Sequence, residues 1–198
     1  RPDLDRTAEY LFDKLHAVAS EQDKLADLAF AYESLAQDRR VKLLPVESQA
    51  AVFLQATRFF SDVFGDPDGA VSYAERVLAA EPGQPEAVAR LEKIFGDSSD
   101  NARLAKLYFD LATHDRDPAV QLARLRQVVE VAADVAEMSA ITVDALSRLH
   151  KIDPGDAWVR DALEQRLVAG GKPRESIKLL EASLAREPAP GEVEAFQL

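Results

Sequence analysis

Apolar residues recur at steps of three and four along almost the whole chain. In the first segment, for example, Leu4, Leu11, Leu15 and Val18 fall on one side of a helix. Alternating patterns of β-branched and polar residues, which would indicate strands, are missing. The pattern predicts an all-α protein of about ten helices, over residues 3–19, 21–37, 47–64, 67–80, 85–95, 102–113, 119–133, 136–151, 157–169 and 174–186.

The segment 65–82 has the clearest start and stop signals of these helices. Asp66 is placed to cap the helix, and Pro67 fits its first turn, where the missing N–H would have no partner. Ala70 and Ala74 then lie on the apolar face. A helix this short cannot bury its apolar face alone, so we expect it to pack against neighbours of the same kind.

The connectors carry further start signals and one apolar linker. Asp100 and Asp156 are placed to cap the helices that follow them. The linker 41–44 ends at Pro45, and we expect it to pack on a neighbouring helix.

Prolines mark a repeated spacing along the chain. Pro154 and Pro188 each follow an acidic residue at the end of a helix and stand 34 residues apart. Pro82 has the same setting, 72 residues before Pro154, and Pro118 falls midway between them. A period near 34 residues with two helices per period indicates stacked helical hairpins.

At particular residues the chain resembles the tetratricopeptide repeat family. Gly65 and Gly171 stand at the family's turn glycine. The first-helix and second-helix positions of the family are matched by Val88, Leu91 and Phe95, by Leu163 and Leu167, by Ala105, Phe109 and Ala112, and by Ser176, Leu180 and Ser183. Departures are Glu92 and Glu164, which replace a small residue, and Glu137, which replaces a turn glycine.

The resemblance implies a single helical-repeat domain over 1–198, built as a right-handed α-solenoid of antiparallel hairpins. Its expected parts are a divergent hairpin at 1–45, repeats at 46–82, 83–118, 119–154 and 155–188, and the start of a further helix at 189–198. An ordinary helical bundle whose prolines happen to have this spacing is the alternative.

Composition and charge narrow the class of partner. Apolar residues at 47% and charged residues at 30% describe a folded, soluble chain. The net charge of −11 disfavours binding to nucleic acid and suits basic or apolar partners. The chain has no cysteine, and no apolar run approaches the roughly 20 residues that span a bilayer, so we expect no membrane insertion. No pattern assigns a compartment, and the cytoplasm is only a default.

Few residues in the sequence could act in catalysis or bind a metal or cofactor. His16, His114 and His150 fall in different predicted hairpins and lack the spacing of metal ligands. The segment 170–173 contains two glycines and a lysine but does not match a phosphate-binding loop. The phenylalanines at 53, 59, 60 and 64 have the spacing of a helical core. We therefore assign no catalytic, metal or cofactor residue and expect a protein that is not an enzyme.

The expected partner is a protein or peptide. The resemblance implies that the first helices of successive repeats line a concave groove, and that such a groove usually binds a peptide or protein segment. In the helical register, the inward positions are Trp158, Asp161 and Gln165, then Glu86, Ala89 and Lys93, and then Gln55 and Arg58. For Gln55 and Arg58 the helical register is shifted, because the chain has one extra residue before Gly65. Trp158, the only tryptophan, has an alternative interpretation, which is packing between neighbouring repeats.

These expectations lead to a non-enzymatic interaction scaffold. Because the chain starts at Arg1 without a methionine, we also expect it to be a piece of a longer protein, and a structural spacer or regulatory segment of a larger enzyme or signalling protein is the alternative function. A helical hydrolase or synthase is a third. Apolar residues near both ends, Leu4, Leu11 and Phe196, suggest end-to-end self-association.

Overall fold

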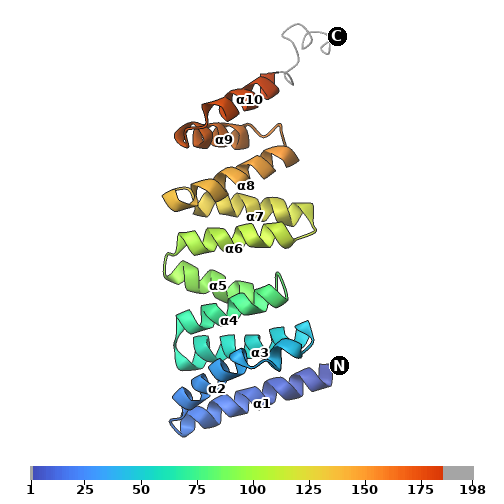
Figure 1. The fold of residues 1–198 in the computed structure, drawn as a ribbon, viewed down its shortest axis with the longest axis vertical. Coiled ribbons are helices and arrows are strands. Elements are labelled where there is room, and N and C mark those ends of the chain that lie inside the picture. The colour runs from blue at the N-terminus through green and yellow to red at the C-terminus, as the bar shows by residue number, and fades with distance from the viewer. Residues whose placement is uncertain (1, 185–198) are drawn as a thin grey trace, which may run out of the picture. The chain divides into compact units, whose positions relative to one another are not determined.

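The structure is a computed structural model that describes the backbone of residues 2–184 and the side chains of residues 9–136 and 138–182. Over this range the chain is all-α, with ten α-helices in sequence (Figure 1). Their bounds are α1 Pro2–Glu21, α2 Leu25–Gln37, α3 Val46–Arg58, α4 Pro67–Ala80, α5 Pro85–Asp97, α6 Asn101–His114, α7 Pro118–Val131, α8 Ser139–Ile152, α9 Ala157–Ala169 and α10 Pro173–Leu184. The predicted fold class is thereby confirmed.

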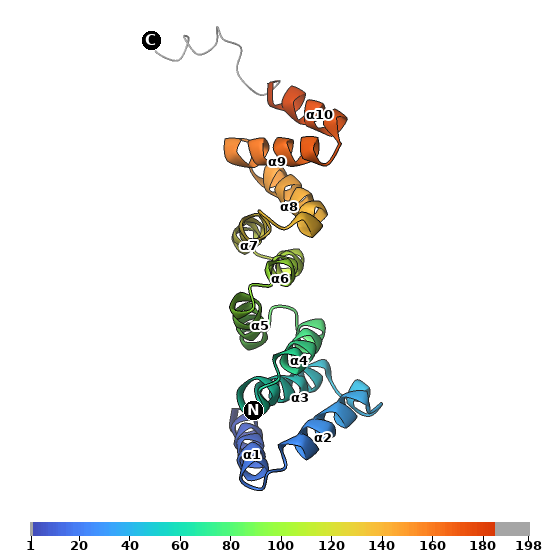
Figure 2. The same ribbon diagram turned by 90° about the vertical axis from the view of Figure 1, so that its left-hand side faces the viewer.

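The chain divides into two compact units, Arg1–Ser99 (unit 1) and Asp100–Leu198 (unit 2). Within each unit the helices pack mainly against their neighbours in sequence, as in a helical repeat. Both views place α3 beside α4 and α6 beside α7 (Figure 1 and Figure 2). Short connections join these packed pairs, so the two helices of each pair run antiparallel. The predicted repeat 46–82 corresponds to α3 and α4, and 119–154 to α7 and α8; the predicted repeat 83–118 would begin in unit 1 and end in unit 2.

The start signals read from the sequence form the expected caps. The carboxylate of Asp66 accepts a hydrogen bond from the Gly69 backbone N–H at 3.0 Å, with Pro67 in the first turn of α4. Asp100 and Asp156 cap α6 and α9 in the same way. Each cap satisfies a backbone donor that the helix itself leaves unpaired.

Several element boundaries differ from the prediction. Helix α2 begins at Leu25 and not at residue 21, because α1 runs to Glu21 and a turn with Asp23 at φ 56° separates the two helices. A short 3₁₀ helix over Ala136–Met138 precedes α8. In the linker 41–44, which forms the 3₁₀ helix η1 (Val41–Leu43), only Val41 is buried, whereas Leu43 is 83% exposed.

The predicted helix over 47–64 changes character at its end. After α3, residues Phe59–Phe64 form a π-helix, η2, which ends at Gly65 in the left-handed region with φ 76°. A π-helix closes its hydrogen bonds over i→i+5, so its ring holds one residue more than an α-turn. The extra residue noted before Gly65 is therefore accommodated inside the helix.

The core of unit 1 is aromatic. Phe59 and Phe60 of η2 are 0% and 2% exposed, and both rings contact Tyr32 of α2. The phenylalanines predicted as core are buried except Phe64, which is 38% exposed. In unit 2 the core is aliphatic and includes Leu125, Val128, Leu146, Leu149, Val159, Leu163 and Leu167. No helix within residues 2–184 is both long and apolar enough to cross a membrane.

A buried histidine joins α1 to the aromatic core. His16 is 7% exposed, and its Nε2 lies 2.8 Å from the Tyr32 hydroxyl, with the Phe59 ring centroid 5.2 Å from the imidazole centroid. Burial lowers the pKa of His16, and the nearby Asp13 opposes this shift only in part. The folded protein therefore favours the neutral imidazole.

This burial predicts that acid destabilises unit 1 through His16. As the pH falls below about 6.5, the histidine of the unfolded chain takes up a proton before that of the folded chain, so the free energy of unfolding should decrease, by at most about 1.4 kcal/mol per pH unit for one proton. Urea titrations between pH 7.5 and 5.5 measure this change. His16→Gln should flatten the dependence, because it removes the group that takes up the proton. Equal pH dependence in the unaltered protein and His16→Gln would contradict the assignment.

Candidate functional site

Two of the predicted groove residues meet in unit 1. The Arg58 guanidinium donates from Nε and Nη2 to the two carboxylate oxygens of Glu86, at 2.7 and 2.6 Å. Its Nη1 donates to Glu9 Oε1 at 2.6 Å. Because Glu9 lies on α1, Arg58 on α3 and Glu86 on α5, these contacts connect the three helices.

The ion pairs continue from Glu86 as a chain of alternating charges. Arg90 Nε donates to Glu86 at 3.1 Å, and Arg90 Nη1 and Nη2 donate to the Asp62 carboxylate at 2.7 and 2.8 Å. Hydrogen bonds from Arg58, and then from Arg90, lower the pKa of Glu86, and those from Arg90 lower the pKa of Asp62. Both carboxylates are therefore ionised and satisfied within the protein. This arrangement links α1, α3 and α5, although the side chains of Glu9 and Asp62 at its two ends stay half-exposed.

The other predicted residues of unit 1, Gln55 and Lys93, form no ion pair with any described residue. Gln55 of α3 is half-buried, and its Oε1 has no hydrogen-bond partner among the described residues. Lys93 of α5 is exposed, and its positive charge contributes to lowering the pKa of Asp62.

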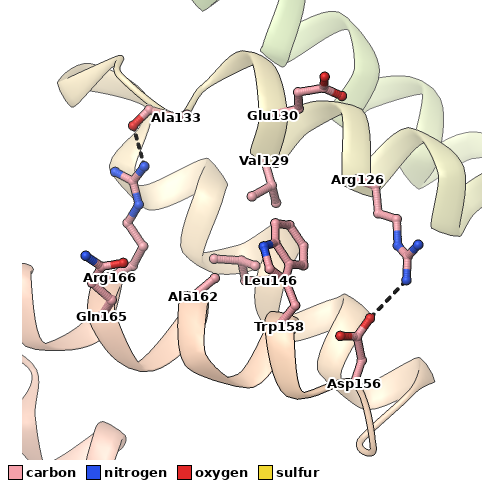
Figure 3. A pocket seen from close by; sticks show the side chains of 10 residues that line it. All are labelled: Arg126, Val129, Glu130, Ala133, Leu146, Asp156, Trp158, Ala162, Gln165 and Arg166. Carbon is pink, nitrogen blue, oxygen red and sulfur yellow. Dashed lines mark hydrogen bonds and ion pairs between the residues drawn. The ribbon is translucent and has the colours of Figure 1, made fainter.

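Unit 2 contains a groove between α7 and α9, centred on Trp158. Trp158 is 55% exposed and stands in the first turn of α9, where the Asp156 carboxylate caps the helix by accepting from the Val159 N–H at 3.2 Å. Figure 3 shows its indole rising from α9 toward Val129 of α7. The cavity measures about 580 Å³ and is lined by Arg126, Val129, Glu130, Ala133, Leu146, Asp156, Trp158, Ala162, Gln165 and Arg166.

The groove combines an apolar floor with a polar rim. Val129, Ala162 and the fully buried Leu146 of α8 form the floor (Figure 3). Two hydrogen-bonded contacts join the α9 side of the cavity to the α7 side, one at each end of the cavity. In the first, Arg126 Nη2 donates to Asp156 Oδ2 at 2.9 Å, and in the second the Arg166 guanidinium donates to the Ala133 carbonyl oxygen (Figure 3).

The rim also holds polar groups that are open to a ligand. Glu130 is exposed and makes no ion pair with any described residue. A groove of this kind can take up one large apolar side chain beside Trp158 and hydrogen-bond the groups that flank it. Among the described residues, no group of three or more histidine, aspartate or glutamate side chains could hold a metal ion.

The structure brings together two of the three residues predicted for this groove. Trp158 and Gln165 line it, and Trp158 is too exposed to be fully packed between neighbouring helices. Asp161 does not line it; its Oδ1 accepts from Arg160 Nε at 3.0 Å. The α7 side of the groove, represented by Arg126 and Glu130, was missed. The same helical register shifted back by one repeat points to Leu122, Leu125 and Val129, and of these only Val129 lines the groove.

A scan of the sequence against protein-family models finds no match, and a search of curated proteins finds no similar sequence. Function is therefore inferred from the residues and geometry of the groove.

Proposed function

We propose that the chain is a tetratricopeptide-like, non-enzymatic interaction module that binds an extended or helical segment of a partner protein in the groove between α7 and α9. The observation that carries this proposal is the half-exposed Trp158 over an open apolar floor. Tryptophan is enriched among residues that dominate binding energy, and an aromatic side chain beside an apolar cavity offers a large contact area at low entropic cost.

Local features support the tetratricopeptide-like assignment. Ala70 and Ala74 of α4 and Ala105 of α6 are fully buried, as expected of small residues that let paired helices approach closely. Gly65 and Gly171 adopt positive φ values of 76° and 70°, which glycine reaches without strain. The proposed repeat register makes α7 and α9 first helices of their hairpins, and the resemblance implies that first helices carry the ligand.

Binding to peptides tests the proposal. A phage-displayed library of random dodecapeptides would be selected on the full chain, and the affinities of the selected peptides measured. Trp158→Ala should weaken binding at least about tenfold, because a hot-spot side chain contributes more than about 1.4 kcal/mol. Since Trp158 is the only tryptophan, its fluorescence should also change when a peptide binds.

The matched control is Val168→Ala. Val168 lies on the same helix and is 56% exposed but does not line the groove. We expect it to leave affinity within about twofold. Peptides that bind the Trp158→Ala and Val168→Ala proteins equally well would refute the groove as the binding site.

A further inference from the structure

Unit 1 contains a second cavity, formed where the C-terminal ends of α2 and α4 approach the start of α3. It measures about 750 Å³, with buried Phe53 as part of its apolar lining. Its charged lining residues are Lys42 of η1 and Arg76 of α4, and no acidic side chain that the structure describes lines it. The chain as a whole has a net charge of −11, so this cavity is a local exception in which positive charge is concentrated beside apolar surface.

Arg76 is held in position without using most of its donors. Its Cζ lies 5.8 Å from the Phe53 ring centroid and 5.5 Å from that of Tyr73, and its Nη1 donates to the Ala36 carbonyl oxygen at 3.4 Å. A guanidinium carries five N–H donors, and that of Arg76 forms no ion pair with any described residue. Cation–π contact with two rings restricts the guanidinium, which reduces the entropic cost of binding a carboxylate.

A smaller cavity that also borders Arg76 is acidic. It measures about 160 Å³, and Glu33 and Asp66 are among its lining residues. Because these carboxylates repel an acidic ligand, they favour its binding in the cavity that contains Lys42. Lys42 is exposed and forms no ion pair within the described residues. Its neighbour Gln49 is fixed by donation from Nε2 to the Leu44 carbonyl oxygen at 2.8 Å.

Apolar surface continues beyond the mouth of the cavity. Leu43 and Leu44, in and beside η1, are 83% and 40% exposed, and they adjoin Val46, which lines the cavity and is 51% exposed. Three neighbouring exposed aliphatic side chains extend the contact area past what a single small molecule in the cavity would cover. This continuity favours an elongated ligand with its own apolar side chains.

We propose that this cavity binds an acidic, amphipathic segment of a partner protein, in which an aspartate or glutamate lies next to a large apolar residue. The carboxylate pairs with Arg76 and Lys42, and the apolar side chain packs on Phe53. The adjacent residues of the segment cover Leu43 and Val46. The site is separate from the Trp158 groove: it lies in the other unit and is built from α2, η1, α4 and a face of α3 that does not carry Arg58.

A pair of synthetic peptides tests the charge requirement. The probe is a fluorescein-labelled octapeptide in which aspartates alternate with leucine and phenylalanine, and its counterpart has asparagine at every aspartate. Fluorescence anisotropy with the full chain should show the aspartate peptide binding at least about tenfold more tightly than the asparagine peptide. Absence of aspartate-peptide binding at millimolar protein, or equal affinity for both peptides, would overturn the proposal.

Variants locate the binding. Lys42→Gln and Arg76→Gln should each weaken binding of the aspartate peptide at least about fivefold; Lys42 is exposed, so its variant tests the site even if Arg76→Gln perturbs folding. Arg39→Gln removes one exposed positive charge of the same connector outside the cavity and should leave the affinity within about twofold. If Arg39→Gln and Lys42→Gln lowered the affinity for the aspartate peptide equally, the attraction would be diffuse and the proposal overturned. The proposal would also be overturned if Trp158→Ala lowered this affinity and Lys42→Gln did not.

Discussion

Replacing Phe59 by alanine is expected to lower the free energy of unfolding of unit 1 by about 3–5 kcal/mol, the range for deletion of a fully buried aromatic side chain. Phe59 is 0% exposed, and its ring centroid lies 5.2 Å from those of His16, Tyr32 and Phe60. The substitution removes apolar burial and leaves a cavity among rings from α1, α2 and η2. It also removes four ring contacts, those with His16, Tyr32, Phe60 and Phe64, and an aromatic pair contributes about 0.5–1.5 kcal/mol beyond area burial.

Urea unfolding followed by circular dichroism measures the overall change, and amide hydrogen exchange of peptides from α1 to α4 assigns it to unit 1. Phe30→Ala is the matched control, because Phe30 is 69% exposed on α2 and its deletion should change stability by no more than about 0.5 kcal/mol. If Phe59→Ala unfolds at the same urea concentration as Phe30→Ala, the aromatic cluster is not the core of unit 1.

The helices and their starts could be predicted because their signals are local. The carboxylates of Asp66, Asp100 and Asp156 each accept from the backbone N–H three residues ahead, so the sequence around the cap is sufficient. The π-helix at Phe59–Phe64 could not be predicted in this way. Its extra residue is accommodated because Phe59 and Phe60 pack against rings from other helices, which is a tertiary effect on the backbone.

The candidate sites depend more than the helices do on contacts between residues that are far apart in the sequence. Helical register alone placed Trp158 and Gln165 on one side of α9, where both line the groove. The pairing of Arg58 with Glu86, 28 residues apart, depends on how α3 and α5 approach each other, and it turns two predicted ligand contacts into internal ones. The cationic cavity at Arg76 was hidden by the net charge, because the charge of a whole chain does not describe one surface.

Leu146→Ala should lower the free energy of unfolding of unit 2 by about 2–5 kcal/mol, because Leu146 is 0% exposed and packs in the aliphatic core. Chemical unfolding followed by Trp158 fluorescence measures this loss. Ile152→Ala on the same helix is the control; Ile152 is 46% exposed, so only a small change is expected. Equal stability of the two variants would contradict the assignment of Leu146 to the core.

Leu146 lies beneath the Trp158 groove, and this position narrows the range expected for the loss of unfolding free energy in Leu146→Ala. The cost of deleting a buried leucine rises with the volume of cavity that remains unfilled, and here the half-exposed indole of Trp158 can move into part of the vacated space (Figure 3). We therefore expect a loss of about 2–3 kcal/mol, with Trp158 emission shifted to shorter wavelength. In the Trp158→Ala background no indole can fill the space, so Leu146→Ala should cost at least about 0.5 kcal/mol more than in the unaltered protein, a coupling that a double-mutant cycle measures by circular dichroism. Additive losses would show that the indole does not reach the floor of the groove, and that Trp158 and Leu146 act independently.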